Sequence, residues 1–311
     1  MRGSGVDDTA RQRASGSAPS ALAQRRDDLS EIERAGRHRL LRRFLHNRPG
    51  VAGLAVIAIL VLLAILSTRI APYDWQAQDI AHRFASPSLS HLLGTDELGR
   101  DIFSRILYGG RYSLTIGFAA VGVSFVVGTL LGTVAGYYRR VDGVVMRLID
   151  IMMAFPGILL AIAIVAALGP GLINVIVAIG INEIPGFTRI TRSLVLSLRE
   201  REFVTAATLI GGSDAYIVRR HVLVNLVSPI IVFASLRIST AVLVGATLSF
   251  LGLGIQPPVP EWGAMVSTAR AYISIAPHTF LFPTLAIFVT VVAFNLLGDA
   301  LRDTLDPTIR D

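Results

Sequence analysis

The chain has 311 residues, of which 52% are hydrophobic and 16% charged, and its mean hydropathy is +0.60. With several apolar runs of about 20 residues, this composition predicts an all-α, polytopic membrane protein rather than a soluble domain. All 29 basic residues are arginine, which excludes a P-loop ATPase because that loop needs a lysine, and the absence of cysteine excludes disulfides and thiolate ligands.

The formal net charge of +7 would suit a nucleic-acid-binding protein. Its arginines, however, gather in segments that flank the apolar runs, as the positive-inside rule describes for cytoplasmic loops. We therefore expect a lipid bilayer, and no nucleic acid, as the partner of this charge.

Residues 1–38 are polar and show no sustained apolar face, so they predict a disordered cytoplasmic tail. The first apolar run begins near residue 50, which is too late for the core of a signal peptide. Residues 39–111 are interpreted as a transmembrane helix, 51–71, followed by an extracytoplasmic loop.

The loop carries four charged residues close together, Asp96, Glu97, Arg100 and Asp101. Their spacing fits neither a metal site nor an acid–base pair, and we expect a capped loop held by ion pairs. The stretch Asp101–Tyr108 predicts a short amphipathic helix in the membrane interface.

Five further spans are predicted in the core, residues 112–302, and a cytoplasmic tail, 303–311, follows it. Gly128, Gly132 and Gly136 recur every four residues and predict close packing against another helix. Pro156 predicts a kink within the third span. The spans are expected at 112–137, 144–168, 172–187, 226–251 and 280–297. Six spans place every arginine-rich loop, and both termini, on the cytoplasmic side.

The longest polar interruption between spans contains EREFVTAATLIGG, residues 200–212. As one helix it would place small residues on a single face, with Ala207 and Gly211 four apart, a spacing that allows close helix approach. The pattern alone also suits an amphipathic helix lying on the membrane surface.

Ionisable side chains inside a span are functional candidates by default. Asp150 is expected to pair locally with Arg147, and Glu183 is placed toward the inner end of the fourth span. Arg237 is placed deepest, where it would either line a pathway and meet a substrate carboxylate or pair with an acid; pairing is favoured.

No catalytic or metal-binding motif accompanies these spans. The six histidines are not spaced as metal ligands on a helix, and the sequence has no HExxH, GxSxG or P-loop motif. We therefore expect no catalytic residue and no metal site.

Four segments, in order, resemble the C-type (OppC- or DppC-like) subunit of binding-protein-dependent peptide permeases, a family of ABC importers. They are the stretch from Leu40 through APYD, HLLGTDELGRDIFSRILYGGRYSL, SFLGLGIQPPVPEWG and GDALRDTLDP. Residues 200–212 resemble the family's EAA loop, although Thr205 stands where many members have Glu and Val224 where many have Pro.

The resemblance implies the type I ABC importer permease fold in a bacterial inner membrane. It implies partners: a B-type permease, ATPase subunits that bind ATP and magnesium, and an extracytoplasmic binding protein. Segment 200–212 would be the coupling helix that docks on the ATPase, through Glu202, Phe203, Ala206, Ala207, Ile210, Gly211 and His221.

The resemblance implies transport of dipeptides or oligopeptides, with glutathione or nickel as alternatives within the same machinery. The absence of cysteine and of histidine pairs in the spans gives nickel no support. An ATP-independent channel or a membrane scaffold is the rival from another class, and an intramembrane enzyme is a poorer one. Neither a channel nor a scaffold needs a small-faced cytoplasmic helix between spans.

Overall fold

The computed structural model describes residues 42–305, so the predicted tail 1–38 and positions 306–311 of the predicted C-terminal tail lie outside the described part. Contacts divide the chain into two units, Met1–Arg48 and Pro49–Asp311. The helices below belong to the second unit, apart from Arg48, the first residue of α3. Across the described range, the only β-pairing is an isolated bridge between Thr95 and Asp101.

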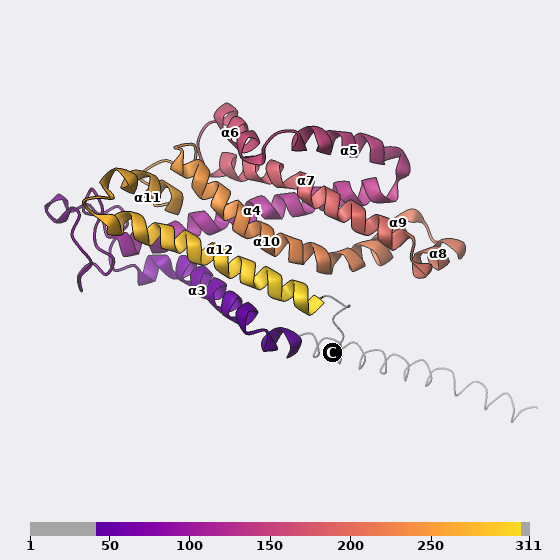
Figure 1. Ribbon diagram of the computed structural model, residues 1–311, viewed down its shortest axis with the longest axis horizontal. Coiled ribbons are helices and arrows are strands. Elements are labelled where there is room, and N and C mark those ends of the chain that lie inside the picture. Colours follow the sequence, from indigo (N-terminus) through magenta and orange to yellow (C-terminus); the bar gives the residue numbers. More distant parts are fainter. Residues whose placement is uncertain (1–41, 306–311) are drawn as a thin grey trace, which may run out of the picture. The chain divides into compact units, whose positions relative to one another are not determined.

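Five helices are long and apolar enough to cross a membrane, and a bent pair would make a sixth span. Within the described residues the predicted all-α architecture of up to six spans is therefore confirmed (Figure 1). The helices are α3 (Arg48–Ile70), α4 (Ile102–Tyr137), α5 (Arg139–Met153), α6 (Gly157–Leu168), α7 (Leu172–Arg199), α8 (Glu202–Leu209), α9 (Asp214–Ile217), a π-helical turn (Val218–Val222), α10 (Leu223–Phe250), α11 (Trp262–Ala269) and α12 (Pro277–Leu305).

Helix α4 runs without a break through the stretch where a separate interfacial helix was predicted at Asp101–Tyr108. That prediction is wrong. The Asp101 carboxylate caps α4, since its Oδ2 accepts from the Ser104 amide and the Ser104 hydroxyl, each at 2.7 Å. The cap satisfies donors that the first turn leaves free, so the helix starts at Ile102 and continues into the span.

The glycine stripe of α4 packs against α7, as the sequence predicts. A Cβ added to Gly132 would lie 2.5 Å from the Thr188 carbonyl oxygen and 2.6 Å from the Thr191 Cβ. A Cβ on Gly128 or Gly136 would lie equally close to α7 side chains. Only glycine allows the backbones of α4 and α7 to come this close, and the contact between these two helices is the most extensive one in the fold.

The third span is broken rather than kinked. Helices α5 and α6 meet at 87° across the residues around Pro156. Proline has no amide hydrogen and its ring collides with the preceding turn, so α5 ends at Met153 and α6 starts afresh at Gly157.

Helix α7 extends twelve residues past the predicted end of the fourth span at Phe187 and stops at Arg199. The first twelve residues of the segment that was predicted as a polar loop are therefore helical. The arginines of that stretch led to its prediction as a loop. One face of the helix, however, carries the buried residues Thr188, Thr191 and Val195, and this face packs on α4.

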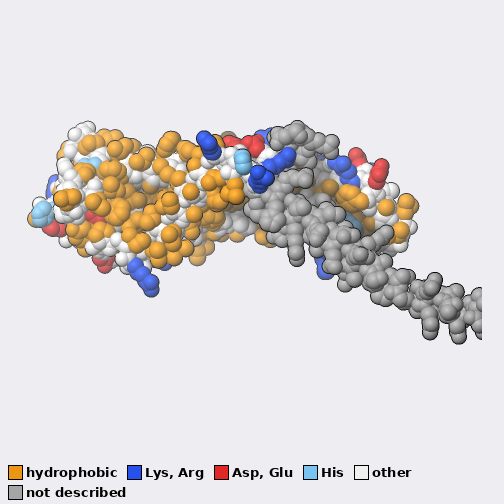
Figure 2. All heavy atoms as spheres, turned by 90° about the horizontal axis from the view of Figure 1, so that it is seen from below, with side chains coloured by type: hydrophobic (Ala, Val, Ile, Leu, Met, Phe, Trp, Pro, Cys, Tyr) orange, Lys and Arg blue, Asp and Glu red, His pale blue; other side chains and the backbone are white. Residues whose placement is uncertain are grey.

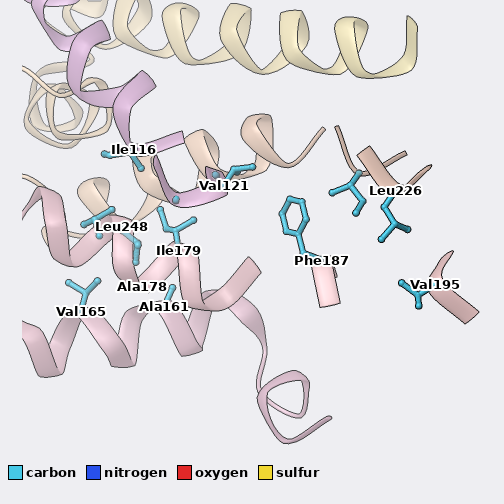
Figure 3. Packing of buried hydrophobic residues seen from close by; sticks show 14 of the residues in the cluster. Ile116, Val121, Ala161, Val165, Ala178, Ile179, Phe187, Val195, Leu226 and Leu248 are labelled. Carbon is cyan, nitrogen blue, oxygen red and sulfur yellow. The ribbon is translucent and has the colours of Figure 1, made fainter. Parts of the chain in front are cut away.

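The core gathers side chains from α4, α6, α7 and α10, such as Ile116, Ala161, Ile179 and Leu248 (Figure 3). Outside this core, hydrophobic side chains cover much of the face shown in Figure 2. A soluble protein would not expose so much apolar surface, whereas lipid stabilises it.

Candidate functional site: the coupling segment and the intramembrane ion pair

Helix α8 spans Glu202–Leu209, shorter than the predicted 200–212. Val204 and Ala207 are buried in the chain's own core, at 4% and 7% exposure. The predicted contact face is therefore wrong at Ala207, because this residue holds α8 against the rest of the chain. Glu202, Phe203 and Ala206 lie on the exposed side.

Gly211 ends the helix in a left-handed turn rather than continuing its face. Its φ is +84°, its amide donates to the Thr208 carbonyl at 3.1 Å, and the Gly212 amide donates to the Ala207 carbonyl at 3.0 Å. These two bonds form a Schellman motif with glycine at its C′ position. No atom lies within 4 Å of a Cβ built on Gly211, so its conformation, rather than crowding by the chain, demands glycine.

The turn presents large apolar side chains to the outside. Leu209 is 82% exposed and Ile210 is 87% exposed, and Phe203 is also exposed. Tyr216 of α9 is exposed and lies beside His221, with ring centroids 5.7 Å apart. We call Phe203, Leu209, Ile210 and Tyr216 the apolar tip.

Sequence reasoning selected Phe203 and Ile210 but missed Leu209 and Tyr216. The prediction assumed one helix up to residue 212, and in that helix Leu209 lies outside the predicted contact face. The pair Gly211–Gly212 could have indicated that the helix ends earlier. His221 is half-buried in the π-helical turn, and its ring centroid lies 6.2 Å from that of Phe203.

One hydrogen bond joins α9 to the end of α4, and a second joins the end of α7 to the end of α4. The Tyr137 hydroxyl donates to the Asp214 Oδ1 at 3.1 Å, and the Arg199 Nη1 donates to the Gly136 carbonyl at 3.1 Å. The Arg199 guanidinium also lies 5.4 Å from the centre of the Tyr137 ring. Helix α8 itself is held to the rest of the chain by its buried side chains, Val204 and Ala207.

In the spans, the structure brings Arg237 of α10 and Glu183 of α7 together. Arg237 Nε lies 3.4 Å from Glu183 Oε2, with side-chain exposures of 35% and 5%. The guanidinium also lies 4.7 Å from the centre of the Phe233 ring. Pairing and the aromatic ring offset the cost of each charge within the membrane.

The predicted local pair of Asp150 with Arg147 is wrong. Asp150 Oδ1 accepts a hydrogen bond from Arg189 Nη2 at 2.6 Å, and this ion pair joins α5 to α7. The sequence also missed a second such link, in which Arg192 donates to both Asp142 oxygens at 2.5 and 2.7 Å. The paired residues lie 39 and 50 positions apart in the sequence, and local spacing cannot indicate such pairs.

A cavity of about 730 Å³ lies among α7, α10 and α12. Its walls combine apolar side chains with the polar groups of Asn225, Ser228 and Arg302. Phe233, the residue beneath the Arg237 guanidinium, is one of its lining residues. The volume falls within the roughly 300–1,000 Å³ of small-molecule sites.

The charged loop residues form the capped, ion-paired loop that was predicted. Arg100 Nε lies 2.7 Å from Asp96 Oδ2, and Arg100 Nη2 lies 2.7 Å from Glu97 Oε1. Further along the loop, a hydrogen bond from His82 holds the pKa of the Asp79 carboxyl below its usual range. Among residues 42–305, no three His, Asp or Glu side chains come together as metal ligands.

Comparison with known proteins agrees with this architecture. Residues 92–311 match the family model "Binding-protein-dependent transport system inner membrane component", and residues 37–87 match "N-terminal TM domain of oligopeptide transport permease C". The chain is 49% identical to the glutathione transport system permease protein GsiD of Pectobacterium atrosepticum, over 86% of this chain and 90% of that protein. It is 50% identical to GsiD of Escherichia coli, over 88% and 91%.

Among solved structures, the chain resembles two inward-facing crystal forms of the MetNI methionine ABC transporter. The TM-score is 0.53 for each, at 19% identity, and the match covers 64–65% of this chain and 95–97% of the other. At this identity the likeness shows the fold. Because the first family model covers most of the sequence, the chain belongs to the inner membrane components of binding-protein-dependent transport systems and is a multi-pass permease of an ABC importer.

Proposed function

We propose that this chain is the C-type permease subunit of an importer for short peptides, with glutathione as its principal substrate. The identity of about half of all residues with two GsiD proteins, over nearly the whole chain, carries this proposal. It favours the glutathione alternative over dipeptides, longer peptides and nickel. The mixed polar and apolar cavity among α7, α10 and α12 suits a small peptide better than a bare ion.

The apolar tip is the surface we assign to the ATPase subunit. Leu209 and Ile210 are more than four-fifths exposed at the end of α8, where water disfavours them and a partner's groove would stabilise them. Glu202, Ala206 and His221 border this surface, and Gly211 shapes it. Val204 and Ala207 of α8 belong to the same buried cluster as Val195 of α7, and Tyr137 joins α4 to α9, so motion of the docked segment would reach α4 and α7.

The remaining assignments follow from this role. The chain performs no bond chemistry, and ATP and magnesium act on the partner ATPase. A homologous B-type permease completes the pathway, and an extracytoplasmic binding protein delivers the peptide. The complex lies in the bacterial inner membrane with both termini of this chain in the cytoplasm, in keeping with the arginines that flank the spans.

Competition for uptake tests the substrate. The permease, its partner permease, its ATPase and its binding protein are expressed together in cells without other glutathione uptake, and labelled glutathione is supplied. We expect uptake that unlabelled glutathione abolishes and that a tenfold excess of a dipeptide, a pentapeptide or nickel leaves nearly unchanged. Uptake of a dipeptide or nickel in place of glutathione would refute the substrate assignment while leaving the importer assignment intact.

A further inference from the structure

An apolar groove with a single cation lies between α3 and α4. Its volume is about 540 Å³, and Arg111 is its one charged lining residue. The Arg111 side chain belongs to an exposed residue, and within residues 42–305 no acid forms an ion pair with it. Apart from Arg111 and Thr115, the lining is apolar and consists of Val61, Ala64, Ile65, Leu114, Phe118 and Ala119.

The groove lies near one end of the spans. Ala64 and Ile65 belong to the last two turns of α3, which ends at Ile70. A Cβ built on Gly110 would lie 3.5 Å from the Ala64 Cβ, so the neighbouring Arg111 is level with this part of α3. Figure 1 shows this end of α3 on the side of α11 and away from α8. Because α8 is the segment that we assign to the ATPase, the groove belongs to the outer half of the bilayer, and Arg111 lies within reach of the lipid headgroups.

The lining of this groove differs from the surface of α4 that packs on α7. Glycines allow the backbones of α4 and α7 to meet, whereas Ile65 and Phe118 line the groove with 66% and 42% of their surface exposed. Close packing of helices in lipid uses small residues, so these large side chains disfavour a further helix. A flexible acyl chain, by contrast, can lie between Ile65 and Phe118 over the buried Ala64.

We propose that the groove binds an anionic phospholipid, with one acyl chain along the apolar lining and the headgroup phosphate on Arg111. A guanidinium presents paired N–H donors whose geometry matches phosphate oxygens, and such charge-assisted hydrogen bonds are the strong ones. Basic residues at the membrane surface also attract lipids of net negative charge. The site therefore prefers phosphatidylglycerol to phosphatidylethanolamine, whose ammonium group the guanidinium repels.

The bound lipid joins α3 to α4 at a place where the protein itself joins them weakly. The two helices make no extensive backbone contact with each other. The close approach of α3 to α12 lies at Gly53, near the opposite end of α3, where an added Cβ would lie 2.7 Å from the Ala293 carbonyl oxygen. An acyl chain in the groove fills the space beside the outer part of α3 and contacts both helices.

The test uses the whole complex, purified in detergent and depleted of lipid. Phosphatidylglycerol that carries a photoreactive group in its acyl chain is titrated in, and mass spectrometry of peptides locates and quantifies the crosslinks. We expect crosslinks within residues 61–65 and 114–119. Unlabelled phosphatidylglycerol should abolish them at about one tenth of the concentration that phosphatidylethanolamine needs, and inorganic phosphate should leave them unchanged. Arg111→Gln should raise the half-saturating concentration about tenfold, the effect expected for loss of a charge-assisted hydrogen bond.

Two further variants separate the charge from the groove. Arg69→Gln is the matched control, because Arg69 is also exposed near the outer end of α3 but does not line the groove. Its half-saturating concentration should stay within about twofold of wild type. Ala119→Phe keeps the charge but fills the groove, and should lower the crosslinking at saturation severalfold.

Unchanged crosslinking in Arg111→Gln would overturn the proposal. An equal loss in Arg69→Gln would also overturn it, because the lipid would then be attracted to the interface in general. Competition by inorganic phosphate would show a simple anion site. A wild-type complex without crosslinks in the groove would show that a partner subunit covers it, and this arm contradicts the proposal even if no variant assembles. None of these measurements uses transport, so their failure leaves the glutathione assignment untouched.

Discussion

At the scale of single residues, Gly211 was selected for a packing role, and the structure gives it a backbone role instead. Its spacing from Ala207 suggested a close contact face, whereas its φ of +84° makes it the terminator of α8. Sequence pattern distinguishes these roles poorly, because both demand glycine. The backbone geometry decides between them: the left-handed turn at Gly211 ends the helix directly after Leu209 and Ile210, whose side chains are exposed.

Substitution of Gly211 therefore should depend on backbone preference rather than on side-chain size. Left-handed geometry costs an L-residue about 1–2 kcal/mol, and asparagine tolerates it best. We expect transport to rank Gly, then Asn, then Ala and Leu together, as measured by uptake in the assembled complex. If Ala transports like wild type while Leu abolishes transport, size is the constraint and Gly211 belongs to a packed interface.

Glu261 is a residue whose role the sequence did not reveal. It is 1% exposed, caps α11 by accepting from the Gly263 and Ala264 amides at 3.0 and 2.9 Å, and accepts from the Ser113 hydroxyl of α4 at 3.0 Å. Glu261 lies in SFLGLGIQPPVPEWG, one of the segments that carry the family resemblance. Its partner Ser113 is 148 residues away in the sequence, so no local pattern could indicate the contact.

Glu261→Ala should lower the stability of the purified protein by about 2–3 kcal/mol, because it leaves buried donors without acceptors. Glu261→Gln keeps one acceptor oxygen and should lose less. Thermal unfolding in detergent measures both, with Asp79→Asn as the control, since Asp79 caps an exposed 3-10 turn. Equal midpoints for Glu261→Ala and wild type would show that the buried cap contributes nothing.

At the scale of elements, apolar runs and small-residue stripes were readable from the sequence, whereas helix ends were not. The stripe of α4 identified a packing surface because glycines every four residues have one main use in a span. The predicted ends of the fourth and sixth spans lie before the observed ends of α7 and α12. Polar residues on one face of a helix resemble a loop in the sequence, and only the structure shows that the opposite face is packed. The links of Asp150 and Asp142 to α7 needed the tertiary fold.

Close packing of α4 on α7 predicts a position-specific effect of a single methyl group. Gly132→Ala should reduce the yield of folded protein severalfold, because its Cβ would lie 2.5 Å from the Thr188 carbonyl oxygen. Gly122→Ala is the control in the same helix, with no atom within 4 Å of the added Cβ. It should leave the yield unchanged or raise it, since alanine favours helix by about 1 kcal/mol. Fluorescence-detected size exclusion of tagged protein compares the two, and equal yields would contradict the packing account.

At the scale of the whole molecule, composition and the apolar runs predicted a polytopic α-helical membrane protein, and the long apolar helices confirm it. A chain that is 52% hydrophobic and lacks lysine cannot carry its own P-loop, so an ATP-driven role requires a separate ATPase. The substrate could not be predicted to the same depth. No motif indicates the cavity among α7, α10 and α12, whose walls come from residues more than 100 positions apart.

Uptake into liposomes tests the central claim, that this permease carries glutathione by an ATP-driven mechanism. The complete complex is reconstituted with ATP enclosed on the ATPase side, and labelled glutathione is added with the binding protein on the other. We predict accumulation above the outside concentration, which is lost without ATP, without the binding protein, or when the partner ATPase is made inactive by substitution. Equilibration of glutathione that is independent of ATP and binding protein would contradict the account and make the chain a channel.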